Sequence, residues 1–167
     1  PSVGDNDGNL DFADASAATT FPCLAAGTVI DTPSGPTVVE DLRVGDAVLC
    51  AGQTPRRVLW IGKRTVTLTP GSDDQRPVRF AVGSLGPNLP DRPLIVSQGH
   101  RMCLSGPLLQ QMYDQPTSLA VAKGLLRLPG ASIMRGLQSV TYVTVLLDQH
   151  AVMRAAAAQF DRTIPLE

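Results

Sequence analysis

The chain of 167 residues has no excess of charge of either sign and no long hydrophobic run. Its 14 Lys and Arg are balanced by 15 Asp and Glu, so no basic surplus exists to neutralise nucleic-acid phosphates or an acidic membrane surface. No apolar stretch approaches the roughly 20 residues that cross a bilayer. These absences predict a soluble protein without nucleic-acid or membrane partners.

Cysteine and histidine are scarce as well. The three cysteines, Cys23, Cys50 and Cys103, are too few for a disulfide framework, and their odd number leaves at least one thiol free. No CxxC or Cys/His metal spacing occurs, so we expect no metal and no cofactor. The two histidines, His100 and His150, must supply any imidazole chemistry.

Residues 1–22 differ in composition from the rest of the chain. They are acidic and rich in Gly, Ala, Ser and Thr, which is typical of a linker or an upstream flank. Asp and Asn alternate around Gly8 as in a calcium loop, but the closing Glu of that pattern is missing, so a solvated tail is favoured. The start lacks both Met and a secretory signal, which indicates a fragment of a longer polypeptide.

From Cys23 onward, short segments rich in Val, Ile, Leu and Thr alternate with Gly, Pro and Asp clusters. This pattern predicts an all-β domain of short strands. The segment "RRVLWIGKRTVTL" predicts a long strand or a hairpin, and "GPLLQQMYDQ", residues 106–115, predicts one short helix. The segment "SLAVAKGLLRL", residues 118–128, predicts a strand pair with a bend at Gly124. Trp60 is expected to serve in packing.

Three separated segments carry a resemblance to a known family. They are "CLAAGTVIDTPSGPTVVEDLRVGDAVL" from residue 23, "PLIVSQGHRMCL" from residue 93 and "VTYVTVLLDQHAV" from residue 140. In this order and spacing they resemble the Hint superfamily, which is shared by inteins, hedgehog autoprocessing domains and bacterial intein-like domains. The likeness is greatest to the bacterial branch. It implies a horseshoe-like fold of antiparallel strands with pseudo-twofold symmetry over residues 23–154, a flank at 1–22 and a tail at 155–167.

The chemistry expected at Cys23 follows from its residue type. A thiolate is a better nucleophile than a hydroxyl at neutral pH, and it can attack the carbonyl just before its own nitrogen to convert the Pro22–Cys23 amide into a thioester. Well-oriented intramolecular attack can lower a barrier by roughly 7–11 kcal/mol. The departing nitrogen must be protonated, and His100 is the candidate acid.

The resemblance supplies the other site residues. It implies that Ser97 takes the place of the threonine in the TxxH block, that His100 is its histidine, and that His150 assists near the same site. Tyr142 and Asp148 are implied as supporting groups, and Val143 stands where relatives carry an aspartate. The predicted function is a single-turnover autoproteolytic step on the chain's own upstream polypeptide, with the thioester resolved by water or another nucleophile.

Two departures limit that prediction. No asparagine follows Asn88, so the cyclisation that completes splicing is not expected, and cleavage should stop at the N-terminal bond. Pro22 has a fixed φ and a hindered carbonyl, which predicts a slow acyl shift.

Other interpretations stay open. Cys23 on its own would be read as a small buried hydrophobe, as Cys50 and Cys103 are. The chain can be an inactive Hint-fold binding or structural module of a larger bacterial protein, secreted or at the cell surface. A Cys/His hydrolase acting on other chains is the third alternative.

Overall fold

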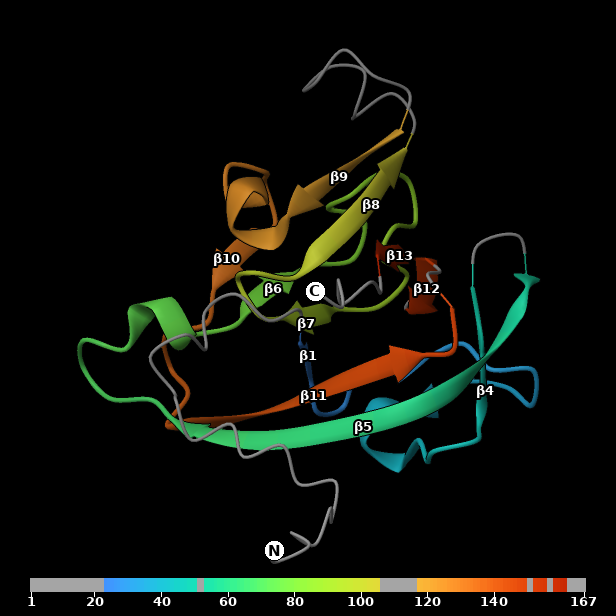
Figure 1. The fold of residues 1–167 in the computed structure, drawn as a ribbon. Coiled ribbons are helices and arrows are strands. Elements are labelled where there is room, and N and C mark those ends of the chain that lie inside the picture. The colour runs from blue at the N-terminus through green and yellow to red at the C-terminus, as the bar shows by residue number, and fades with distance from the viewer. Residues whose placement is uncertain (1–22, 51–52, 106–116, 150–151, 156–157, 162–167) are drawn as a thin grey trace, which may run out of the picture.

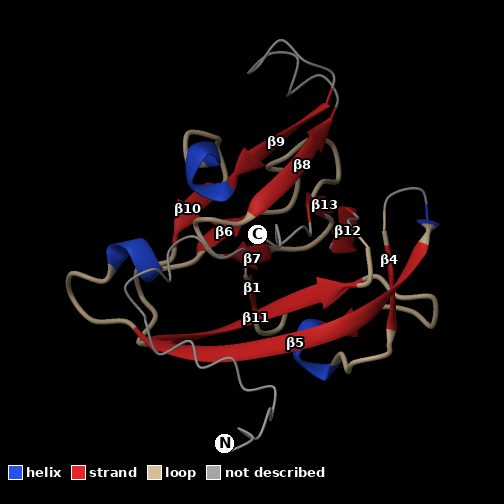
Figure 2. Ribbon diagram, viewed as in Figure 1, coloured by secondary structure: helices blue, strands red, loops and turns tan. Residues whose placement is uncertain are grey.

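The structure is a computed structural model that describes residues 23–50, 53–105, 117–149, 152–155 and 158–161. Strands are the main regular structure of this part of the chain, and the helices are short 3-10 turns at its margins (Figure 2). The prediction of an all-β domain is therefore confirmed. The predicted helix at residues 106–115 lies outside the described residues.

The strands form two sheets in which every pair is antiparallel. The first sheet comprises, in spatial order, β10 (Ala131–Ile133), β6 (Val78–Phe80), β7 (Leu94–Val96), β1 (Leu24–Ala25), β11 (Ser139–Leu147), β5 (Pro55–Thr67) and β4 (Ala47–Leu49). The second comprises β3 (Thr37–Val38), β2 (Val29–Ile30), β12 (Val152–Ala155), β13 (Ala158–Asp161), β8 (Arg101–Ser105) and β9 (Thr117–Val121). Three 3-10 helices join described strands: η2 (Val39–Asp41), η4 (Asp73–Gln75) and η5 (Ala122–Leu125).

Strands β5 and β11 form the longest pair, and they run side by side across the molecule (Figure 1). Their register extends from Thr67 opposite Ser139 to Val58 opposite Leu147. The segment "RRVLWIGKRTVTL" is thus one long strand rather than a hairpin. Within it, a Cβ atom on Gly62 would clash with the Trp60 indole, so the missing side chain allows the ring to lie along its own strand.

The segment at residues 118–128 does not form the expected strand pair. Strand β9 ends at Val121, and the chain continues as the 3-10 helix η5. Ala122 and Leu125 are both fully buried, and a 3-10 helix aligns residues three apart on one face. The prediction of a bend at Gly124 between two strands was wrong because this i, i+3 apolar spacing favoured a helical turn.

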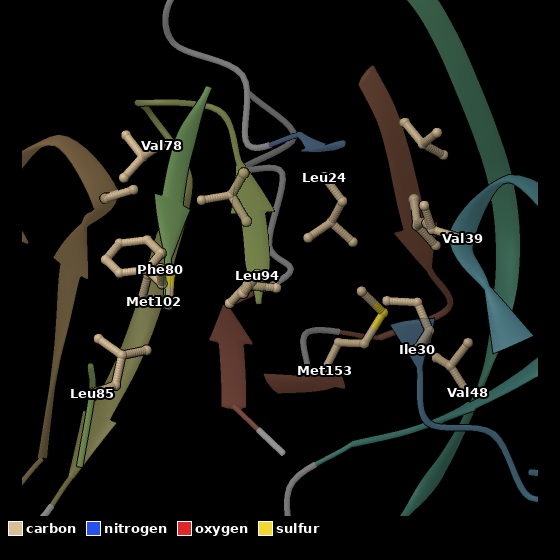
Figure 3. Close-up of a cluster of buried hydrophobic side chains, with 14 of the residues drawn as sticks. Leu24, Ile30, Val39, Val48, Val78, Phe80, Leu85, Leu94, Met102 and Met153 are labelled. Carbon is tan, nitrogen blue, oxygen red and sulfur yellow. The ribbon is translucent and has the colours of Figure 1, made fainter. Parts of the chain in front are cut away.

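Two hydrophobic clusters lie on opposite faces of β11. Val143, Val145 and Leu147 belong to the large core, whereas Val140 and Tyr142 belong to a small cluster. Successive side chains of a strand point to opposite faces, so this alternation divides β11 by residue parity. Strand β1 is divided in the same way, because Leu24 lies in the large core between Leu94 and Val39 (Figure 3) and its neighbours do not.

The C-terminal part of the fold continues beyond residue 154. Strand β13 pairs with β12 and with β8, which ties residues 158–161 to the second sheet. The predicted boundary between domain and tail at residue 154 stays a prediction, and β13 argues for a later one.

Candidate active site

Cys23 is held at the start of the central strand of the first sheet. Strand β1 lies between β7 and β11, with Leu24 opposite Val96 on one side and Val143 on the other. Cys23 itself is 8% exposed and belongs to the small cluster with Ala25 and Tyr142. A thiol at this position is therefore fixed by backbone pairing on both sides.

Ser97 forms two hydrogen bonds with Cys23. Its backbone N–H donates to the Cys23 carbonyl oxygen at 2.9 Å, and its side-chain Oγ accepts from the Cys23 N–H at 3.0 Å. The Ser97 side chain thus contacts the Cys23 nitrogen.

His100 is brought back toward this region by a tight turn. Its N–H donates to the Ser97 carbonyl oxygen at 3.1 Å, and its own carbonyl oxygen accepts from Ala122 N–H at 2.8 Å. Its side chain is fully buried. The backbone of His100 is thus fixed between Ser97 and η5, three residues from the hydroxyl that contacts the Cys23 nitrogen.

Thr144 is a site residue that the sequence reasoning missed. Its Oγ1 lies 3.1 Å from Cys23 Sγ, and either atom can be the donor. Thr144 has the same parity on β11 as Tyr142, so both side chains face the small cluster. In "VTYVTV", the sequence shows that Thr144 and Tyr142 share one face of the strand. Only the register between β1 and β11 shows that this face lies against Cys23.

Tyr142 packs beside Cys23 and holds a neighbouring loop. Its hydroxyl donates to the Gln75 carbonyl oxygen at 2.7 Å. Burial raises the pKa of Tyr142, a negative charge on Cys23 raises it further, and the Arg64 guanidinium opposes both. The phenol therefore stays protonated at neutral pH and keeps its hydrogen to donate.

Further hydrogen bonds hold the loop that carries η4 next to the site. Gln98 Nε2 donates to the carbonyl oxygens of Asp73, at 2.6 Å, and Arg76, at 3.0 Å. Buried Arg76 also pairs with the Asp73 carboxylate at 3.2 Å. Hydrogen bonding from Arg135, with help from Arg76, lowers the pKa of Asp73, so that carboxylate is charged at neutral pH.

A small pocket opens onto Cys23. It has a volume of about 10 Å³, roughly the room that one water molecule needs. Its lining residues come from β5, the η4 loop, the loop after β7 and β11 as well as Cys23 itself; they are Cys23, Arg64, Asp74, Gln75, Ser97, Gln98 and Tyr142. A pocket of this size has room for a water molecule next to Cys23.

Asp148 lies away from this group. It follows the end of β11, four residues beyond Thr144, which is roughly 13 Å along a strand. It is exposed, its N–H donates to the Arg57 carbonyl oxygen at 3.0 Å, and its charge contributes to the raised pKa of Cys50. The structure thus associates Asp148 with Cys50 rather than with Cys23.

Several predicted features lie outside the described residues. These are Pro22, His150 and the Asp-rich stretch before residue 12. Within the described ranges, no group of three or more His, Cys, Asp or Glu side chains is arranged to hold a metal ion. No helix in the same ranges is long and apolar enough to cross a membrane.

One family model matches most of the chain, and several solved structures share its fold. The family model of the Hint domain matches residues 22–165. No curated protein matches the chain. Among solved structures, the bacterial intein-like domain from Clostridium thermocellum has a TM-score of 0.58 at 14% identity, and the match covers 86% of this chain and 100% of that one.

Two inteins show the same likeness. The MchDnaB-1 intein has a TM-score of 0.55 at 17% identity, with 84% of this chain and 99% of that chain covered. The gp41-1 intein has a TM-score of 0.53 at 14% identity, with 84% and 98% covered. At these identities the likeness establishes the fold, and it extends over nearly the full length of each relative.

Proposed function

Because the chain belongs to the Hint domain family, we propose that it is a self-processing domain that cleaves the bond between Pro22 and Cys23. Family and fold support self-processing of a flanking polypeptide in general. The specific step proposed here rests on one observation, the hydrogen bond from Cys23 N–H to Ser97 Oγ at 3.0 Å. That nitrogen is the leaving group of the reaction, and a hydroxyl is already in contact with it.

The proposed step is an N-to-S acyl shift. The Cys23 sulfur loses its proton and forms a bond to the Pro22 carbonyl carbon, and the bond from that carbon to the Cys23 nitrogen breaks. The nitrogen gains one proton and becomes an amine, so the net proton transfer is from sulfur to nitrogen. Because a hydroxyl both accepts and donates, Ser97 can accept from the amide N–H and then donate to the developing amine.

The histidines take the acid and assisting roles in this proposal. We assign His100 as the source of the proton for the leaving nitrogen, since its backbone is tied to Ser97 and its side chain is buried. His150 keeps its predicted assisting role. Asp148 has no part in the proposed step, because its N–H donates to the Arg57 carbonyl oxygen and its charge acts on Cys50.

Resolution of the thioester completes the proposed reaction. Water or a small thiol attacks the Pro22 carbonyl carbon, releases the upstream segment and regenerates the Cys23 thiol. The pocket at Cys23 has room for about one water molecule. Residues 89–167 contain no asparagine, and the proposed reaction is therefore limited to the N-terminal bond.

The test is a fusion in which a carrier protein precedes Pro1. Incubation with dithiothreitol or hydroxylamine should release a fragment that ends at Pro22, carried as the thioester adduct or the hydroxamate and identified by mass spectrometry. The matched control is Cys23→Ala, which should stay intact. Equal behaviour of the two proteins over several days would refute the proposal.

One observation favours a second candidate, an inactive module that keeps the fold. Cys23 is only 8% exposed and its pocket holds about one water molecule, so external nucleophiles have little access. This candidate predicts an intact chain with or without thiols in the native protein. Mild denaturant separates the two candidates. Cleavage that begins on partial opening would support the acyl shift in a domain limited by access, and a chain that stays intact would support the inactive module.

A further inference from the structure

The side chain of Thr144 contacts the Cys23 sulfur, and the acyl shift proposed above assigns no function to it. The separation of 3.1 Å between Sγ and Oγ1 is within hydrogen-bonding range for sulfur. Val143, the preceding residue, is fully buried in the large core on the opposite face of β11, so it does not contact the thiol. On this strand, Thr144 is therefore the residue whose hydroxyl lies within hydrogen-bonding range of the Cys23 sulfur.

Thr144 is held in a defined orientation. It is a β-branched residue inside a strand, and such side chains have few χ1 choices. Its cross-strand partner on β5 is Gly62, which has no side chain to compete for the hydroxyl. The Trp60 indole lies over Gly62 and provides an apolar neighbour on that side. The hydroxyl thus has a fixed place beside the sulfur.

We propose that Thr144 is a further residue of the active site, whose hydroxyl orients and activates the Cys23 thiol for attack. The proposal rests on the acyl shift proposed above. A threonine hydroxyl can accept a hydrogen bond from S–H and, after rotation, donate one to S⁻. The bond to the charged sulfur is the stronger of the two, so the contact favours the attacking form. The hydroxyl itself is neither consumed nor modified.

Charged and titratable groups also face Cys23 from the neighbouring elements. Arg64 lies on β5, Asp74 in η4 and Tyr142 on β11, and all three line the pocket. They act through space, and their charges are unchanged when Thr144 is replaced. A comparison of Thr144 variants at one pH therefore isolates the hydroxyl.

The experiment uses two measurements on the same fusion protein. The first is the rate of cleavage in dithiothreitol. The second is the rate at which iodoacetamide modifies Cys23, measured by peptide mass spectrometry with Cys50 in the same chain as reference. Thr144→Val removes the hydroxyl and keeps the shape. We expect cleavage and Cys23 modification to slow about tenfold to 100-fold, the loss typical of one hydrogen bond to a charged group.

Two controls distinguish a role at the sulfur from a role in folding. Thr144→Ser keeps the hydroxyl and should recover both rates to within about twofold of the native protein. Thr141→Val removes a threonine hydroxyl from the same strand, one that bonds Thr65 at 2.8 Å instead of Cys23, and should leave both rates unchanged. If Thr144→Val melts far below the native protein, Thr144→Ala carries the same prediction.

The two measurements separate this inference from the proposed function. If the native fusion never cleaves, the acyl shift is refuted, and the modification rates still decide whether Thr144 activates the thiol. If the native fusion cleaves while Thr144→Val matches it in both rates, the role of Thr144 is overturned and the acyl shift stands.

Discussion

Cys23 and Cys50 are both buried thiols, yet their surroundings differ in kind. Cys23 is contacted by two hydroxyls, Ser97 on its nitrogen and Thr144 on its sulfur, and it lines a pocket. Cys50 is 2% exposed within the large core, and burial raises the pKa of its thiol. Burial alone therefore does not distinguish a nucleophile from a packing residue. The polar groups directed at the sulfur and at the nitrogen of Cys23 make that distinction.

The largest expected effect separates the two thiols directly. Cys23→Ala should abolish thiol-induced cleavage, while Cys50→Ala should cleave at the native rate, because Cys50 has no described contact with the site. Stability should respond differently from cleavage. Cys50→Ala leaves a cavity in the large core and should lower the free energy of unfolding by about 1–2 kcal/mol. Cleavage assays and chemical denaturation of both variants check this. Loss of cleavage in Cys50→Ala would remove the basis of the comparison.

The next effect concerns the hydroxyl on the Cys23 nitrogen. Ser97→Ala should slow cleavage on the order of 10²-fold, because it removes the group that contacts the leaving nitrogen. Ser97→Thr keeps a hydroxyl at the same place and should retain most of the rate. The initial rate in dithiothreitol is the measurement. A Ser97→Ala variant that cleaves as fast as the native protein would show that the contact has no part in the chemistry.

A third, smaller effect concerns access to the pocket. Tyr142→Phe removes the hydrogen bond to the Gln75 carbonyl oxygen, which should cost about 1 kcal/mol of stability and loosen the η4 loop. Iodoacetamide should then modify Cys23 about twofold to fivefold faster, and Cys50 at an unchanged rate. Peptide mass spectrometry of both cysteines provides the measurement. A parallel increase at Cys50 would indicate general unfolding instead of local opening.

The contrast between the two thiols was visible in the sequence only in part. The order of the segments around Cys23, Ser97 and His100 predicted the family and the all-β fold, both of which are confirmed. The resemblance also implied that Ser97 belongs to the same site as Cys23, and the structure shows a hydrogen bond between the two residues. The segments that carry the resemblance can be recognised without knowledge of which strands pair.

What the sequence did not predict depends on pairing between distant strands. Thr144 contacts a residue 121 positions away, and the contact exists because β1 pairs with β11 in one particular register. A shift by one residue would direct Val143 at the thiol instead. The resemblance implied Asp148 as a supporting group, whereas Asp148 follows the end of β11, where its charge acts on Cys50.

The smallest expected effect tests the raised pKa of Cys50 through stability at alkaline pH. The folded chain keeps this thiol protonated above its usual value of 9.0, while the unfolded chain releases the proton there. Deprotonation thus favours the unfolded state, so the stability contributed by the neutral thiol is complete below pH 9 and is lost as the pH rises toward the folded pKa.

The measurement is the melting temperature of the native protein and of Cys50→Ala at about pH 8 and about pH 10. The native protein should lose about 1–3 °C more than the variant over this interval, since the variant has no thiol to titrate at that position. Cys23 and Tyr142 are present in both proteins, so their titration cancels in the difference. An equal loss in the two would mean that the Cys50 environment does not favour the neutral thiol, and that the two cysteines differ less than their contacts indicate.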